Sequence, residues 1–391
     1  MRAPLTRHYL DHASTTPLRP AAVAAMAEWL ERLGTPDGAG DPARVHEEGR
    51  LAREAVEVAR SQVAALGGVP PNRVVFTSGG TEAVNTALAA AGPGSRVLCS
   101  RVEHSSVRKA ADRAGTLVEV EVGPDATLDL EHLAVLLASA PNGEVVVNCQ
   151  WANHEVGTVQ PLGAVAELCT AHGARLHVDA AAAFGHVPTD LAALDATFVS
   201  LSAHKMGGPS GVGALVLGRG VRLRPLLVGG PEERARRAGA ENLLGIVGFG
   251  AAAASLLEDD RLLDEHARAA AQRDALAEAA EAAGGVRRLG PGPERLLPHI
   301  VGALVEDVLG EAVLLGLDRA GVAAHSGSSC SSEVLEPSPV LEAMGVDPDR
   351  SLRLSVGWST TDDDVSAFAS CFPEVLRRLR ELKRTPGGGP S

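Results

Sequence analysis

Apolar and polar positions follow two alternating patterns over the first 250 residues. Short apolar runs, typical of buried strands, occur at 73–77, 96–100, 117–122, 144–148, 175–178, 197–201 and 212–217. Helical spacing of apolar residues occurs at 21–33, 45–66, 104–115, 129–139 and 161–173. Apolar strands that alternate with helices predict an α/β fold, in which helices cover a mostly parallel sheet.

The pattern changes near residue 250. The elements predicted beyond it are a long Ala/Leu/Glu-rich helix at 241–284, a strand at 301–305, a helix at 311–320, a strand at 351–358 and a helix at 361–385. We therefore predict a large domain of residues 16–250 and a smaller domain of residues 251–391 that also includes residues 1–15.

Composition narrows the classes of protein that this chain can represent. The net charge of −13 lacks the basic field that direct nucleic-acid binding requires. The five cysteines are scattered without a Cys-x-x-Cys pair, which favours reduced thiols in the cytosol over disulfides or a zinc site. Neither a signal-peptide core nor an uninterrupted apolar run long enough for a membrane span is found, so we expect a cytoplasmic protein with no membrane or metal partner.

Side chains that can bind ligands or transfer protons follow several of the predicted strands. They are Thr81, His104, Asn153, His154, Glu155, Asp179, His204 and Lys205. In parallel sheets ligands collect at the carboxyl ends of the strands. One polar residue at a strand end is often a helix cap, but several that converge on one edge predict a binding site.

Lys205 is the most unusual of these residues, because it ends a buried apolar run. An isolated lysine at a strand end often points into solvent, but burial lowers the pKa of a lysine and makes it a nucleophile suited to Schiff-base chemistry. Pyridoxal phosphate requires such a lysine, a carboxylate for its ring nitrogen and an anion cradle for its phosphate. Lys205, Asp179 and Thr81 with Ser202 could supply these groups.

Two residues of the last third also carry candidate chemistry. Cys330 lies in a Ser/Gly-rich stretch with few apolar neighbours, so it is the one candidate for an exposed, reactive thiol. Arg353 lies in a strand, where it could bind a substrate carboxylate or form a surface ion pair. An arginine-rich loop at 222–237 is interpreted as a solvated face, a dimer interface or an anion site.

Taken together, these motifs resemble the cysteine desulfurases, which are class-V aminotransferase-like, fold-type I pyridoxal-phosphate enzymes. The segments that carry the resemblance are 9–17, 76–82, 103–104, 153–158, 177–180, 202–205, 326–332 and 352–355. They span nearly the whole chain in the order of the family.

The resemblance implies a large domain with a mostly parallel seven-stranded sheet and a smaller α+β C-terminal domain. It implies conversion of L-cysteine to L-alanine, with the sulfur left as a persulfide on Cys330. The implied catalytic residues are Lys205, Cys330 and His104. The implied cofactor-binding residues are Lys205, Asp179, Gly80, Thr81, His154, Ser202, His204 and His104. The implied substrate-binding residues are Arg353, Asn153 and His154.

The resemblance further implies a homodimer that passes sulfur to an acceptor protein, as in iron–sulfur cluster assembly or tRNA thiolation. A selenocysteine lyase or another class-V lyase or aminotransferase would use the same lysine and aspartate. A non-catalytic, partner-binding homologue in sulfur trafficking is a further alternative. A dinucleotide-binding oxidoreductase is disfavoured, because no Gly-x-Gly-x-x-Gly follows the first strand.

Three positions depart from the family pattern. His154 stands where the family usually has asparagine, Ala182 where it has glutamine and Ala240 where it has threonine. Each lost neutral hydrogen bond is expected to cost about 1 kcal/mol of cofactor affinity. The covalent and charged anchors are unaffected, so we expect an active but divergent member.

Overall fold

A computed structural model describes residues 6–38, 40–92, 94–140, 145–326, 329–331 and 334–384. Within them, no helix is both long and apolar enough to cross a membrane.

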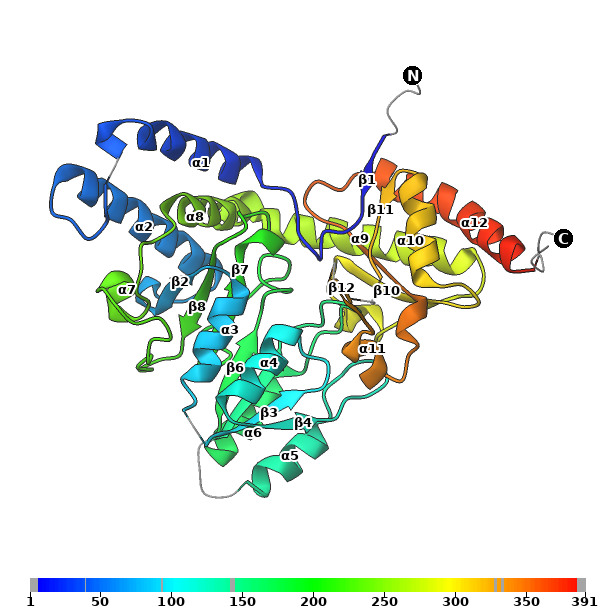
Figure 1. Cartoon of the computed structure of the whole chain (residues 1–391), viewed down its shortest axis with the longest axis horizontal. Coiled ribbons are helices and arrows are strands. Elements are labelled where there is room, and N and C mark those ends of the chain that lie inside the picture. The colour runs from blue at the N-terminus through cyan, green and yellow to red at the C-terminus, as the bar shows by residue number, and fades with distance from the viewer. Residues whose placement is uncertain are drawn as a thin grey trace.

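A sheet of seven strands forms the larger part of the molecule (Figure 1). Its strands are β2 (Val74–Thr77), β3 (Arg96–Ser100), β4 (Thr116–Val120), β5 (Val145–Gln150), β6 (Arg175–Asp179), β7 (Phe198–Ser202) and β8 (Gly213–Leu217). The spatial order is β2-β8-β7-β6-β5-β3-β4, and β8 alone runs antiparallel to its neighbours. The predicted α/β fold with a mostly parallel seven-stranded sheet is therefore confirmed.

Helices cover both faces of this sheet. They are α1 (Pro20–Leu33), α2 (Glu47–Leu66), α3 (Gly80–Ala89), α4 (Ser105–Ala114), α5 (Leu130–Ala138), α6 (Leu162–His172) and α8 (Leu243–Leu257). Side chains alternate along each strand, so Val74 and Phe76 pack into the main core with α2 and α8, whereas Val75 packs against α3. This double cover explains why the strands are apolar at nearly every position.

A second hydrophobic core lies around a small antiparallel sheet. This sheet has the order β14 (Ser351–Ser355), β10 (Ile300–Val305) and β9 (Val286–Arg288). It packs with α9 (Arg261–Ala282), α10 (Gly310–Arg319) and α12 (Asp362–Arg384). The remaining elements are α7 (Glu232–Ala235), α11 (Pro339–Ala343) and the hairpin of β12 (Ser329–Ser331) and β13 (Val334–Glu336).

The two ends of the chain meet in this second part. Strand β1 (His8–Tyr9) pairs in parallel with β11 (Val322–Ala323), and Leu10 belongs to the second core. The N-terminal segment then runs from there towards the large sheet (Figure 1). Residues that are more than 300 positions apart in sequence are thereby brought together.

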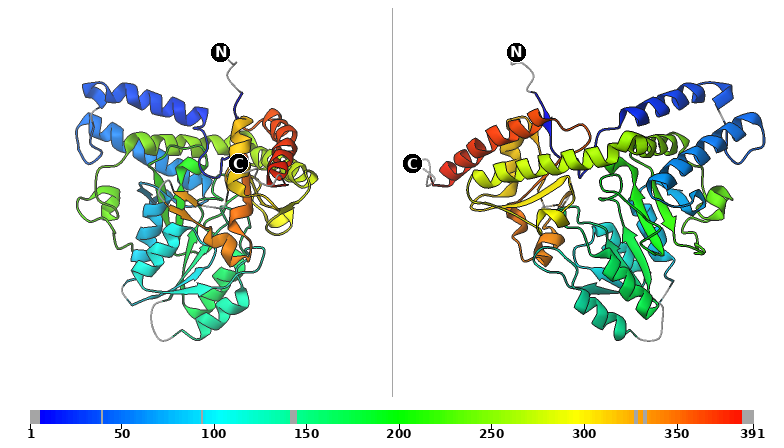
Figure 2. Two further views of the ribbon diagram at one scale, coloured as in Figure 1. Left: turned by 45° about the vertical axis from the view of Figure 1, so that its right-hand side comes forward. Right: turned by 180° about the vertical axis from the view of Figure 1, so that it is seen from behind.

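The predicted single helix at 241–284 is wrong. Two helices, α8 and α9, are separated by a short turn at Glu258–Asp260, although they run on from one part of the molecule to the other (Figure 2). Asp259 and Asp260 have φ angles of 48° and 55°, in the left-handed region that interrupts a right-handed helix. Because the Ala/Leu/Glu-rich composition is the same on both sides of the turn, the sequence pattern does not reveal the break between the two helices.

Candidate active site

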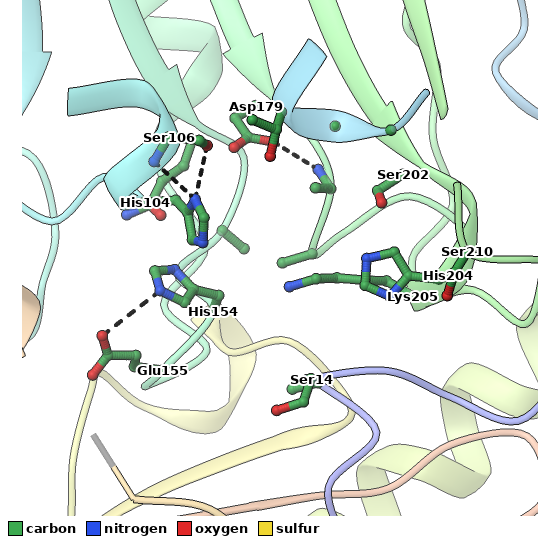
Figure 3. A pocket seen from close by; sticks show the side chains of 18 of the residues that line it. Ser14, His104, Ser106, His154, Glu155, Asp179, Ser202, His204, Lys205 and Ser210 are labelled. Carbon is green, nitrogen blue, oxygen red and sulfur yellow. Dashed lines mark hydrogen bonds and ion pairs between the residues drawn. The ribbon is translucent and has the colours of Figure 1, made fainter. Parts of the chain in front are cut away.

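A cavity of about 580 Å³ opens at the carboxyl edge of the large sheet, where the two parts of the molecule meet (Figure 3). The structure brings together in its lining these predicted site residues: Gly80, Thr81, His104, His154, Asp179, Ser202, His204, Lys205 and Arg353. This convergence follows from the parallel strands, whose carboxyl ends share one edge.

Lys205 ends the short 3-10 turn Ala203–Lys205 that follows the buried strand β7. Burial lowers its pKa to about 8, with a further lowering by Arg353 and partial opposition by Asp179 and Asp11. Its amino group points across the cavity, and within the described residues it has no hydrogen-bonding or ion-pair partner (Figure 3). Lys205 is therefore set up as a nucleophilic amine and a base.

Asp179 is the last residue of β6, and its Oδ1 accepts a hydrogen bond of 3.0 Å from the N–H of Ala181. Burial raises the pKa of Asp179, while that N–H, His104 and Lys205 act in the opposite direction. A buried carboxyl of this kind is stabilised as an anion when a cationic group faces it.

His104 is the N-cap residue of α4. Its Nδ1 accepts a hydrogen bond of 3.1 Å from the N–H of Ser106, which directs the hydrogen of the neutral ring to Nε2. Burial is the main cause that lowers the pKa of His104. The neutral ring thus lines the cavity beside Asp179 (Figure 3).

The start of α3 provides an anion cradle. The helix begins after Gly79, whose φ of 151° favours glycine, and no side chain caps it within the described residues. Its first N–H groups therefore remain available, beside the hydroxyls of Thr81 and Ser202 in the cavity lining. Such a cradle suits one phosphate group.

One arginine of the 222–237 loop reaches this cradle. Arg237 forms an ion pair of 3.0 Å with Glu82, which also accepts a hydrogen bond from the N–H of Ser78. The pair offsets a carboxylate charge that would otherwise repel an anion at the start of α3. Arg237 is thus not part of a solvated face.

Arg353 is buried in β14, with 5% of its surface exposed. It forms an ion pair of 2.9 Å with Asp11 and donates hydrogen bonds to the Ser14 hydroxyl and, at 3.0 Å, to the His154 carbonyl. Its Nε has no hydrogen-bond partner in the described part of the chain. The alternative of a surface ion pair is therefore wrong, because Arg353 and Asp11 are both largely buried.

Asn153 does not line the cavity, in contrast to its predicted contact with substrate. It is fully buried; its Oδ1 accepts hydrogen bonds of 2.9 Å from the N–H groups of Glu155 and Val156, and its Nδ2 donates to the Val102 carbonyl. The two hydrogen bonds to Oδ1 hold the turn after β5. Its neighbour His154 faces the cavity instead.

The five cysteines divide into two groups. Cys99, Cys149 and Cys169 are buried and Cys371 is half-buried, and burial raises the pKa of each thiol, that of Cys169 to about 12. Cys330 is the middle residue of β12, and its side chain lies outside the described residues.

Several residues of the site were not assigned a role from the sequence. Asp11, Ser14 and His325 reach the cavity region only through the pairing of β1 with β11 and the bridge of His325 to Arg353. The segment 9–17 was recognised as a motif, but nothing local in it indicates an arginine partner more than 300 residues away.

Ala182 and Ala240, two of the three positions that depart from the family pattern, have different surroundings. Ala182 lies at the cavity wall in an apolar cluster with Ala13 and Ala152, so the wall offers no hydrogen bond there. Ala240 is exposed, three residues beyond Arg237.

Comparison with known proteins agrees with this fold. Residues 8–368 match the aminotransferase class-V family, so the chain belongs to that family. It is 35% identical to the cysteine desulfurase IscS of Methanosarcina thermophila, over 96% of this chain and 93% of that protein. It is 36% identical to the cysteine desulfurase IscS 1 of Archaeoglobus fulgidus, over 96% and 98%.

A solved structure of similar fold is the NifS-like protein of Rickettsia africae. The TM-score is 0.85 at 27% identity, over 95% of this chain and 99% of that one. The apo cysteine desulfurase of Thermococcus onnurineus shares the fold, with a TM-score of 0.84 at 22% identity and 95% of each chain covered.

Proposed function

We propose that this protein is a pyridoxal-phosphate-dependent cysteine desulfurase. It converts L-cysteine to L-alanine, leaves the sulfur as a persulfide on Cys330 and passes it to an acceptor protein. The observation that carries the proposal is the amino group of Lys205, with its pKa lowered to about 8, in one cavity with Asp179 and Arg353. The class-V family and relatives named as cysteine desulfurases support it.

The donor set of the cavity fits pyridoxal phosphate. Lys205 would attach it, Asp179 would face its ring nitrogen and His104 would stack on its ring. Gly80, Thr81, Ser202 and His204 would hold its phosphate at the start of α3, and His154 would contact the ring hydroxyl. The uncapped helix start and the buried carboxyl of Asp179 support this fit. When bound, the group supplies an electron-accepting ring that acidifies the α-carbon hydrogen of an amino acid.

The residues of this chain would then act on the substrate. Arg353, which lines the cavity, would bind the carboxylate of L-cysteine and so orient the amino acid. Lys205 would take the proton from the α-carbon, since its neutral amine is accessible near neutral pH. Asn153 is left out of this assignment, because it holds the turn that presents His154.

Sulfur transfer would use Cys330. Its thiolate attacks the sulfur of the substrate, so a sulfur–sulfur bond forms while the bond from sulfur to the β-carbon breaks. The electron pair of that bond remains with carbon, which takes up a proton and yields alanine. The Ser/Gly-rich sequence around Cys330 supports its movement to an acceptor.

We also propose a homodimer and a division into two domains. The sequence predicts their boundary at residue 250, which lies inside α8, and we propose instead the turn between α8 and α9. Helix α8 packs into the core of the large sheet and α9 into the second core, which supports this boundary. Exposed apolar side chains at Leu226, Leu227 and Val228, within the arginine-rich loop at 222–237, support an interface role for that loop. The acceptor is proposed to be a protein of iron–sulfur assembly or tRNA thiolation.

The test is incubation of the purified protein with pyridoxal phosphate and then with L-cysteine. A visible absorbance band, equimolar alanine and one added sulfur on the Cys330 peptide by mass spectrometry are expected. Lys205→Ala should lose the band, whereas Cys330→Ala should keep the band and lose sulfur release. Unchanged turnover in Cys330→Ala would indicate an aminotransferase, and a wild-type protein without the band would contradict the proposal.

A further inference from the structure

The cavity wall opposite Lys205 carries a second titratable pair, His154 and Glu155, in the turn after β5 (Figure 3). His154 Nε2 lies 3.6 Å from Glu155 Oε1. The other side of the His154 ring packs edge-on against His104, with centroids 5.1 Å apart. The side chain of Asn153 fixes the backbone of this turn, so both residues are held in place.

Glu155 is held from behind by Ser338, the N-cap residue of α11. The Ser338 hydroxyl lies 2.9 and 2.7 Å from the two carboxyl oxygens, and it also accepts a hydrogen bond from the N–H of Leu341. The Ser338 hydroxyl donates its one hydrogen to the carboxyl group and so holds Glu155 in place. Burial raises the pKa of Glu155 to about 7, against the opposing effects of Ser338 and Arg353.

His154 itself stays neutral. Burial lowers its pKa well below the usual value, and four groups that are cationic when protonated act in the same direction: His104, Lys205, Arg353 and His325. Near neutral pH Glu155 is therefore the member of the pair that takes up and releases a proton.

The proposed reaction requires a proton at the β-carbon of the substrate. The side chain of cysteine carries two hydrogens on its β-carbon and that of alanine carries three, so one proton must be added there. Lys205 is assigned to the α-carbon, and its amine gains a proton at that carbon.

We propose that His154 delivers the proton to the β-carbon and that Glu155, positioned by Ser338, resupplies His154. This inference rests on the proposed function. In one concerted transfer the second ring nitrogen of His154, Nδ1, gives its hydrogen to carbon, while Nε2 takes the hydrogen of the Glu155 carboxyl. Glu155 is left as a carboxylate and regains a proton from solvent. The 3.6 Å contact between ring and carboxyl is of a kind that shortens when substrate binds.

Hydrogen exchange of L-alanine in D₂O tests this assignment without sulfur transfer. With pyridoxal phosphate bound, the wild-type protein should exchange the α-hydrogen and the methyl hydrogens, followed by proton NMR. His154→Asn should lower methyl exchange about 100-fold and should lower α-exchange far less than methyl exchange. His172→Asn, at an exposed histidine of α6, is the matched control and should change neither rate.

The pH dependence of methyl exchange separates proton donation from a structural role. Methyl exchange of alanine starts with removal of a proton from the β-carbon, which is the reverse of the proposed delivery and needs Glu155 as a carboxylate. This form is lost below the pKa of Glu155, so the wild-type rate should fall below about pH 7. Glu155→Gln should abolish this fall and lower the rate. Ser338→Ala should move the fall to higher pH, because the Ser338 hydrogen bond lowers the pKa of Glu155.

A second measurement uses the full-length chain before cofactor is added. The imidazole NMR signal of His154 should shift with a midpoint near pH 7 that disappears in Glu155→Gln. An unshifted signal, or equal loss of α- and methyl exchange in His154→Asn, would overturn the inference. If the wild-type protein exchanged neither hydrogen, the proposed function would fail first, and this assignment with it.

Discussion

At the scale of single residues, Lys205 owes its lowered pKa chiefly to burial. The unfolded chain binds a proton at this lysine more tightly than the folded chain does, so the lysine destabilises the fold below pH 8. This cost declines as the pH rises and is gone above about 10.5. The same burial that makes the amine reactive thus lowers the stability of the protein.

Lys205→Met should therefore stabilise the cofactor-free protein at pH 7. An increase of about 1–3 kcal/mol in the free energy of unfolding is expected, since the opening to the cavity screens part of the effect. Urea unfolding at pH 7 measures it. Lys109→Met, at an exposed lysine of α4, should change the stability by less than about 0.5 kcal/mol; equal effects of the two substitutions would contradict the prediction.

Arg353 is expected to determine affinity more than rate. Arg353→Lys keeps the charge but loses the planar fork, so it cannot serve Asp11, Ser14 and a substrate carboxylate together. We expect the KM for L-cysteine to rise about 10- to 100-fold, the equivalent of 1.4–2.7 kcal/mol. Steady-state kinetics measure this, and an unchanged KM would show that the carboxylate is bound elsewhere.

At the scale of elements, the loop at 229–242 depends on a buried ion pair. Arg60 of α2 contacts both carboxyl oxygens of Glu233 at 2.8 Å, and Glu233 also accepts a hydrogen bond from the N–H of Phe76. Glu233 has a left-handed φ of 48°, which local preferences disfavour. The pair fixes the loop that carries Arg237 to the anion cradle.

Arg60→Met should leave the Glu233 carboxylate buried without its cation. The expected loss is about 3–5 kcal/mol in the free energy of unfolding, together with weaker binding of pyridoxal phosphate. Denaturant unfolding and a titration of the visible absorbance band measure the two effects. Glu57→Gln, which removes the more exposed partner of Arg60, should cost less than about 1 kcal/mol.

The elements themselves could largely be predicted from the sequence. Apolar runs bounded by polar residues identified β3, β6 and β7 with small errors at their ends, because strands covered on both faces need apolar residues throughout. The break between α8 and α9 was missed, since two aspartates in a left-handed conformation leave no mark in the apolar pattern.

At the scale of the whole molecule, two stacked histidines connect the part that contains the large sheet with the part that contains the small sheet, next to the cavity. His186 lies between β6 and β7 of the large sheet and His299 precedes β10, and their rings stack with centroids 3.7 Å apart. His186 also contacts the Lys205 carbonyl at 2.9 Å. Burial lowers the pKa of His186 to about 4 and that of His299 well below its usual value.

Acid should therefore weaken this junction. The unfolded chain binds protons at these histidines below about pH 6.5, so their contribution to stability is present above that pH and is lost as the pH falls. Glu103 and Glu155, whose pKa values are raised, act in the opposite direction, so the variant must be compared with the wild type. His299→Asn should reduce the loss of stability between pH 7 and pH 5 by about 2 kcal/mol. Urea unfolding at both pH values measures it, and an equal loss in both proteins would contradict the prediction.

The sequence by itself determined the α/β architecture and the edge of the sheet at which chemistry occurs. Burial on both faces demands apolar strands. Asp179 ends such a strand, and Lys205 and His104 each lie a short turn beyond one. These are local features of the chain.

Only the tertiary structure decided how the cavity is closed. The contact of Asp11 with Arg353 and that of Glu155 with Ser338 join residues 342 and 183 positions apart. The structure also decided that Asn153 points into the protein while His154 points into the cavity. Sequence pattern records which side chains prefer burial, but the partner of a buried polar group depends on how distant elements pack.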